Sequence, residues 1–173
     1  MRRRAVVLAV AVLGGALLVA SLGVAASGKK NLKAGDLTGY EENPDLSTVA
    51  TGSFRATLDD AAQTIAYELS YSGLESDVLQ AHVHFGKRAI NGGISFFLCT
   101  NLGNGPAGTP ACPQSGTVSR TVTASDILGP TAQGIEAANF AELAAAMRAG
   151  HSYANVHTTG RPGGEIRAQI NER

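Results

Sequence analysis

Two histidines stand two residues apart in the segment Leu79-Gln80-Ala81-His82-Val83-His84-Phe85-Gly86. Apolar and polar residues alternate there with a period of two, which predicts a strand with His82 and His84 on one face. Their backbones would then lie roughly 6–7 Å apart, close enough for both rings to reach one small ion. The alternative is that both histidines are exposed on the wet side of a half-buried strand.

A third histidine, His157, lies in a similar pattern near the C-terminus. If Ala154 and Val156 face the core of a strand over residues 152–158, then His157 faces outward, as His82 and His84 do. Three neutral imidazoles with an open position suit zinc or copper, and copper heads the affinity order for nitrogen ligands. A common ion requires ring nitrogens within roughly 3–4 Å of one another. This in turn requires the two strands to be neighbours, since otherwise the rings simply bond to loop backbone.

Residues 152–158 and 165–170 predict a C-terminal hairpin with a turn between them. By the same alternation, the side chains that face away from the core are Tyr153, Asn155, His157, Glu165, Arg167 and Gln169. We therefore expect Asn155, Glu165 and Arg167 to support the metal site from a second layer.

The remaining elements are mostly short strands. Alternation predicts a hairpin of residues 52–58 and 64–71. An almost wholly apolar run predicts a central strand over 94–99 that is covered on both sides, and a segment rich in Thr and Val predicts a strand over 116–123. One helix is predicted after Asn139, which can cap it, with Glu142 three residues on and Gly150 at its end. About seven strands and one short helix near the C-terminus indicate a mostly β fold, an antiparallel sandwich or barrel.

The N-terminus has the composition of a secretory signal peptide. Residues 2–4 are arginines, an apolar run follows to Ala26, and Val24-Ala25-Ala26 offers a cleavage site. The alternative is an uncleaved membrane anchor. The expected organisation is a signal peptide over 1–26, a polar linker over 27–33 and a single domain over 34–173.

Charge and length restrict the function classes. Without the three arginines of the signal, eleven basic residues face fourteen acidic ones, a net charge of −3. With no basic stripe, nucleic acid is not expected as a partner, and a membrane is expected only if the N-terminal segment is retained. Export also allows the only two cysteines, Cys99 and Cys112, to form a disulfide that closes the loop between them. That spacing is far from the C-x-x-C of a catalytic dithiol.

Other catalytic groups are poorly supported. No serine lies in G-x-S-x-G, and carboxylates such as Glu41 and Glu42 are too common to indicate a glycosidase pair.

In combination, five blocks of the chain resemble the CHRD domain, first recognised in chordin and also found in secreted microbial proteins. These blocks, which span about residues 34–171, are Leu37-Thr38-Gly39-Tyr40-Glu41-Glu42-Asn43-Pro44, Ala81-His82-Val83-His84-Phe85-Gly86, Asn91-Gly92-Gly93, Gly150-His151-Ser152-Tyr153-Ala154-Asn155-Val156-His157-Thr158 and Pro162-Gly163-Gly164-Glu165-Ile166-Arg167-Ala168-Gln169. The resemblance implies an immunoglobulin-like or superoxide-dismutase-like Greek-key sandwich. It implies no settled activity.

The likeness to copper,zinc superoxide dismutase falls on the same histidines. His82 and His84 are similar to two copper ligands of that enzyme, and His157 to a third. However, residues 86–150 hold no histidine to bridge two metals and the zinc-holding set is missing. The arginine that guides superoxide has no position matched by a shared motif, and Arg167 is the residue offered for it. A working copper,zinc dismutase is therefore not expected.

Two functions follow for the chain. The first is a secreted, non-catalytic module that binds an extracellular protein, the matrix or the cell surface and needs no cofactor. The alternative is a copper or zinc protein with a three-histidine site, either vestigial or copper-only with dismutase-like redox activity.

Overall fold

The computed structural model describes residues 28–172. The elements, in chain order, are eight strands and one α-helix besides short 3₁₀ turns: β1 (Lys30–Ala34), β2 (Thr51–Asp59), β3 (Thr64–Ser72), β4 (Val78–Phe85), β5 (Ile94–Thr100), β6 (Gly116–Thr123), α1 (Phe140–Arg148), β7 (Ser152–Thr158) and β8 (Ile166–Glu172). All strand pairings are antiparallel. The predicted mostly β class with one short helix near the C-terminus is confirmed.

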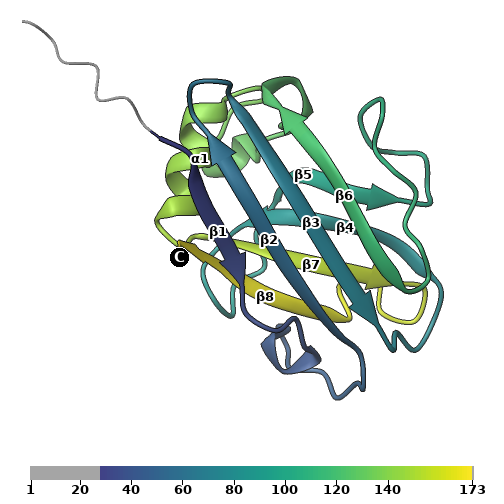
Figure 1. The fold of residues 1–173 in the computed structure, drawn as a ribbon. Coiled ribbons are helices and arrows are strands. Elements are labelled where there is room, and N and C mark those ends of the chain that lie inside the picture. The colour runs from purple at the N-terminus through teal and green to yellow at the C-terminus, as the bar shows by residue number, and fades with distance from the viewer. Residues whose placement is uncertain (1–27, 173) are drawn as a thin grey trace, which may run out of the picture.

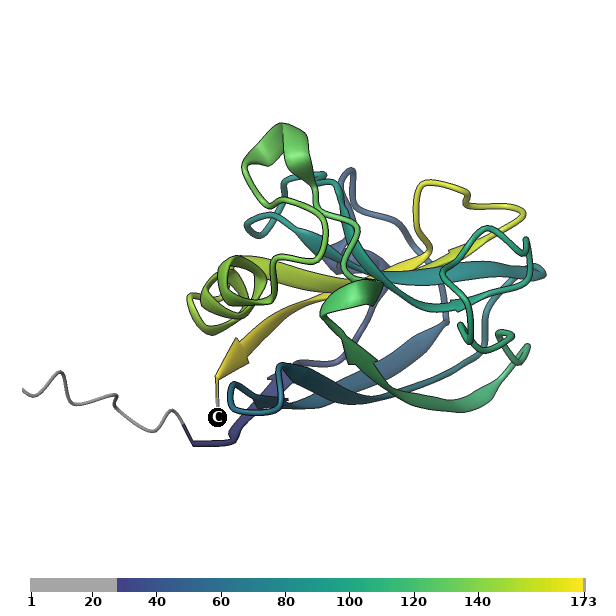
Figure 2. The ribbon, with the colours of Figure 1, turned by 90° about the horizontal axis from the view of Figure 1, so that it is seen from above.

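The strands form one hydrogen-bonded sheet that folds into two layers. Their order is β5-β4-β7-β8-β1-β2-β3-β6, and the layers join where β8 pairs with β1 (Figure 1). Seen from above, β4, β5, β7 and β8 form one layer and β1, β2, β3 and β6 the other, with α1 at one end (Figure 2). The architecture is therefore a sandwich that is continuous at one edge.

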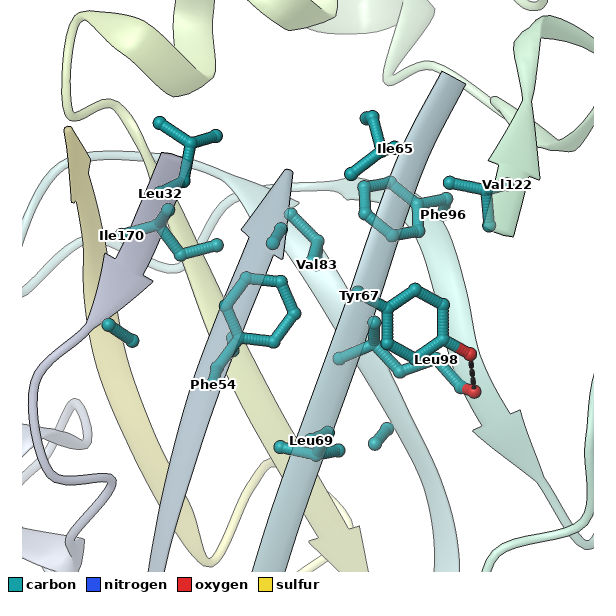
Figure 3. Close-up of a cluster of buried hydrophobic side chains, with 14 of the residues drawn as sticks. Leu32, Phe54, Ile65, Tyr67, Leu69, Val83, Phe96, Leu98, Val122 and Ile170 are labelled. Atoms are coloured by element: carbon teal, nitrogen blue, oxygen red, sulfur yellow. Dashed lines mark hydrogen bonds between the residues drawn. The ribbon is translucent and has the colours of Figure 1, made fainter. Parts of the chain in front are cut away.

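The core lies between the layers and follows the predicted alternation. In the β2–β3 hairpin, Phe54, Tyr67 and Leu69 point inward and are buried (Figure 3). The phenol of Tyr67 donates a hydrogen bond to the backbone carbonyl of Leu98 in β5, which links the two layers on the side away from the β8–β1 junction. Each inward side chain thus removes apolar surface from water, which is the main stabilising contribution to such a fold.

Helix α1 begins as its sequence predicts. The side chain of Asn139 accepts a hydrogen bond from the backbone N–H of Glu142, which satisfies one of the free donors of the first turn. Its inward stripe is fully or nearly buried: Phe140, Leu143, Ala144 and Met147. Gly150 follows with a positive φ of 71°, a conformation that favours glycine and ends the helix.

Two expectations about the strands were wrong. Strand β1, Lys30–Ala34, includes residues 30–33 of the predicted polar linker and pairs with both β2 and β8. The exposed residues Asn31 and Lys33 alternate with buried Leu32 and Ala34, so the strand has only a narrow apolar face for the sequence to reveal. Strand β5 lies at the edge of the sheet instead of its centre, although both of its faces are buried.

The cysteines form the predicted disulfide between Cys99 and Cys112. The loop that it closes is further held by Asn101, whose side chain donates to the carbonyl of Cys112 and accepts from its N–H. The predicted signal peptide, over residues 1–26, lies outside the described residues.

The outer face of β7 and β8 carries the polar side chains predicted to point outward, but it is not solvated. Arg167 and Gln169 alternate with the core residues of β8 and are nevertheless buried. The loop over residues 86–93 covers them, since Arg167 donates to the carbonyls of Lys87 and Ile90 and Gln169 to that of Gly86. The outer face of β7 and β8, which the alternation predicts to be polar, is therefore covered by a loop and forms a second, smaller buried region.

Candidate metal centre

Strands β4 and β7 are neighbours, and their pairing brings the three histidines together. His82 lies opposite Asn155 and His84 opposite Tyr153, which places His157 diagonally across from His82 on the same face. The ring centroids are 5.3 Å apart for His82 and His84, 5.0 Å for His82 and His157, and 5.6 Å for His84 and His157. One ring nitrogen from each histidine lies within 4.8 Å of the other two.

Two of the rings are oriented by backbone carbonyls. The Nδ1 atom of His84 lies 3.0 Å from the carbonyl oxygen of Gly92, and that of His157 lies 3.1 Å from the carbonyl oxygen of Pro162. A carbonyl only accepts, so each Nδ1 carries the proton and each Nε2 keeps a free lone pair. Histidine ligands of metals are usually fixed in this tautomer and orientation by such a bond.

The free nitrogens are buried without a partner. Both ring nitrogens of His82 and the Nε2 atoms of His84 and His157 each expose less than 1 Å² and make no hydrogen bond within the described chain. Buried polar atoms without a partner are rare, and each calls for a specific explanation. One nitrogen of each neutral ring has a free lone pair, so the three rings together could supply three ligand atoms to a metal ion.

Aromatic side chains form the walls of the cluster. Phe97 of β5 lies opposite His82, with ring centroids 4.4 Å apart and planes at 84°. Tyr153 is stacked on His84, with centroids 4.9 Å apart and planes at 4°. The surroundings of the rings are therefore largely apolar.

Burial keeps the three imidazoles neutral. It is the main cause that lowers the pKa of His82 to about 2, and the neighbouring rings of His157 and His84 act in the same direction. Burial is also the main cause that lowers the pKa values of His84 and His157 to about 4. In each ring the hydrogen bond to a carbonyl raises the pKa and offsets part of this shift. Neutral imidazole is the form that binds a metal, so the cluster is in its ligand state at neutral pH.

The three residues predicted to support the site are on the same outer face but make different contacts. Asn155 donates to the carboxylate of Glu42 at 2.6 Å and to the carbonyl of Ile166 at 2.9 Å. Arg167 lies with its guanidinium 3.4 Å above the ring of Tyr153 and thus reaches His84 through that ring. Of the three side chains, that of Arg167 is linked to a histidine, since the ring of Tyr153 lies in contact with both Arg167 and His84.

Glu165, the third of these residues, holds other parts of the fold. Its buried carboxylate accepts hydrogen bonds from the hydroxyls of Thr48 and Thr158 and from the backbone N–H of Glu75. It therefore joins β7 to two loops, and its bonds do not go to the histidines.

Sequence reasoning missed the contacts that orient the rings. Tyr153 and His157 share one strand face by alternation, so a role for Tyr153 was accessible from the sequence. The roles of the Gly92 and Pro162 carbonyls could not be predicted from the sequence, because every residue has a carbonyl and only the loop conformation brings these two to the rings. The fourth histidine, His151, is half-exposed and lies outside the cluster.

The fold and the site thus define a two-layered β-sandwich with a buried cluster of histidines on one outer face. The family model of the CHRD domain matches residues 34–170, and the chain belongs to this family. No curated protein and no solved structure matches the chain. Within residues 28–172, none of the helices is long and apolar enough to cross a membrane.

Proposed function

We propose that this chain is an extracellular CHRD module that binds one transition-metal ion through His82, His84 and His157. Copper is preferred over zinc because it heads the affinity order for nitrogen ligands. The observation that carries the proposal is the set of buried ring nitrogens without a partner, two of which are Nε2 atoms of rings whose Nδ1 donates to a carbonyl.

The cluster is close to the geometry that an ion needs. Nitrogens bonded to one ion at about 2 Å lie roughly 3–4 Å apart, whereas these lie within 4.8 Å of one another. The rings therefore have to approach by up to about 1 Å when an ion binds. Side-chain rotation supplies such a movement without any change in the strands.

The proposed role is non-catalytic. Each of the free nitrogens exposes less than 1 Å², so a bound ion has no contact with solvent through which a substrate could reach it. The chain also lacks the histidines that a second, bridged metal would require. A buried ion held by two paired strands acts instead as a stabilising link between them.

The extracellular location rests on two observations. The N-terminal residues have the charge and hydropathy pattern of a signal peptide, and the chain uses both of its cysteines in one disulfide. Disulfides persist in oxidising compartments.

Metal titration tests the proposal. We expect the wild-type protein to bind one equivalent of copper and, more weakly, one of zinc. His84→Ala should lose at least tenfold in affinity, since replacing a group that only orients a ligand already costs about that much. His151→Ala is the matched control, because His151 is a histidine outside the cluster, and it should bind as the wild type does. Equal binding by wild type and His84→Ala would refute the site.

A further inference from the structure

The histidine cluster is an uncharged ligand set. Among residues 28–172, the group of side chains whose ligand atoms lie within 4.8 Å of one another contains His82, His84 and His157 and no carboxylate. Both cysteines are in the disulfide, so no thiolate is provided either. An ion bound there keeps its full charge.

The charges on the same outer face do not compensate for this. The guanidinium of Arg167 acts on His84 and disfavours a positive charge there. Glu42 faces Arg167, and burial raises its pKa to about 7, so it is only partly ionised at neutral pH. The hydrogen bonds of the Glu165 carboxylate go to Thr48, Thr158 and the N–H of Glu75, and no carboxylate is among the groups that shift the pKa values of the three histidines. The surroundings therefore supply little negative charge to a dication.

Burial makes this lack of charge decisive. The cost of removing an ion from water grows with the square of its charge, so a dication costs about four times as much as a monocation of the same size. The apolar rings of Phe97 and Tyr153 beside His82 and His84 give the site a low dielectric constant. The neutral imidazoles repay only part of the larger cost.

The number of available ligands also favours a monovalent ion. Zinc sites are four-coordinate and Cu(II) favours tetragonal geometry, so both require a further ligand beyond three imidazoles. The free nitrogens each expose less than 1 Å², which leaves no water-sized space beside them for that ligand. Cu(I) is a d¹⁰ ion that is satisfied by three nitrogen ligands.

We propose that the cluster of His82, His84 and His157 selects monovalent copper, Cu(I), over Cu(II) and zinc. This inference rests on the proposed metal binding and specifies the charge of the ion. A site that binds Cu(I) more tightly than Cu(II) raises the reduction potential of the bound ion.

Competition titrations of the wild-type protein test the selectivity. Cu(I) is supplied anaerobically with ascorbate, which leaves structural disulfides intact, and competes with bathocuproine disulfonate; Cu(II) competes with nitrilotriacetate. We expect affinity for Cu(I) to exceed that for Cu(II) by about 100-fold or more, which raises the potential by about 59 mV for each factor of ten. The loaded protein should give no copper signal in electron paramagnetic resonance.

A matched pair of variants tests the charge argument itself. His157→Glu and His157→Gln have nearly the same size and differ by one negative charge. We expect the ratio of Cu(I) to Cu(II) affinity to be lower in the Glu variant than in the Gln variant. An equal ratio in the two would overturn the electrostatic explanation.

The outcomes separate this inference from the proposed function. Tight binding of Cu(II) or zinc with weaker binding of Cu(I) would overturn the selectivity and leave the metal site intact. Failure of the wild type to bind any of the three ions would refute the site and the selectivity together. These wild-type measurements are decisive even if the His157 variants do not fold.

Discussion

Tyr153 and His84 face each other across the β4–β7 pairing, and both bond to the same glycine. The rings are stacked at 4.9 Å, the backbone N–H of Gly92 donates to the phenol oxygen of Tyr153, and the carbonyl of Gly92 accepts from Nδ1 of His84. Gly92 is thus held from both sides of its backbone. The orientation of the histidine therefore depends on a tyrosine that is not itself a ligand.

Replacing Tyr153 should weaken metal binding without removing a ligand. Tyr153→Phe keeps the stacked ring but leaves the N–H of Gly92 without its acceptor, which should cost about 1 kcal/mol of stability. We expect about a tenfold loss of copper affinity, as for other groups that orient ligands, and a larger loss for Tyr153→Leu, which also removes the stacking. Urea unfolding and copper titration measure the two effects. Wild-type values for Tyr153→Phe in both assays would contradict this role.

The metal-free protein should lose stability in mild acid. The pKa values of His84 and His157 in the folded state are about 4 and that of His82 about 2, compared with 6.5 for an unperturbed histidine. As the pH falls below 6.5 the unfolded chain takes up these protons first, so the free energy of unfolding decreases by about 1.4 kcal/mol per pH unit for each such histidine. Urea midpoints between pH 7.5 and 4.5 measure this slope. It should be smaller in His157→Gln, and a flat wild-type profile would contradict it.

Glu42 should contribute a dependence of the opposite sign. Burial raises its pKa to about 7 from 4.5, although the amide of Asn155 and the charge of Arg167 lower it in part. The folded state binds this proton more tightly than the unfolded state, so the contribution of Glu42 is full below pH 4.5 and is lost as the pH rises through 7. Glu42→Gln should therefore be more stable than the wild type by about 3 kcal/mol at pH 8.

The comparison with wild type isolates Glu42 from the histidines, which titrate in an overlapping range. Because both proteins keep His82, His84 and His157, the histidine contribution cancels in the difference between their unfolding free energies. The stabilisation by Glu42→Gln should disappear near pH 4.5. A difference that stays constant with pH would show that Glu42 is not the group responsible.

Loss of the disulfide should lower stability and leave the sandwich assembled. Closing a loop of this length contributes roughly 3 kcal/mol by the chain-entropy estimate. The paired Cys99→Ser and Cys112→Ser variant should lose about that amount in urea unfolding and keep its far-ultraviolet circular dichroism, because Asn101 still holds the loop. In the native, unreduced wild type, titration should find no reactive thiol.

The parts of the fold that could be predicted from the sequence are those whose signals lie in neighbouring residues. Alternation in β2 and β3 and the Asn139 cap of α1 depend on neighbouring residues, and both were predicted with nearly correct limits. The edge position of β5 was not predicted, because an apolar run indicates that a strand is buried but does not indicate its place in the order of strands. For β1, the decisive feature is a pairing partner at the other end of the chain.

The candidate site was likewise predicted from the sequence only in those parts that depend on local patterns. Strand parity placed His82, His84 and His157 on matching faces, and the required pairing of β4 with β7 is present. The burial of that face was not predicted, since it arises from loops such as residues 86–93 that carry no periodic pattern. Asn155 and Glu165 have the predicted orientation, but their partners, Glu42 and Thr48, come from a distant loop whose position no local rule specifies.

The pairing of β1 with β8 has a consequence for the order of folding. Leu32 lies opposite Glu172 and Ala34 opposite Ile170, so the two layers are joined by the strands nearest the two ends of the described chain. Folds dominated by contacts this far apart in sequence form slowly, because the entropy of closing the chain is lost before the contacts stabilise it. The β2–β3 hairpin is able to form early, whereas closure must wait for the last strand. Until β7 and β8 are in place, His157 cannot reach His82 and His84, so the proposed metal site is assembled only in a completed fold.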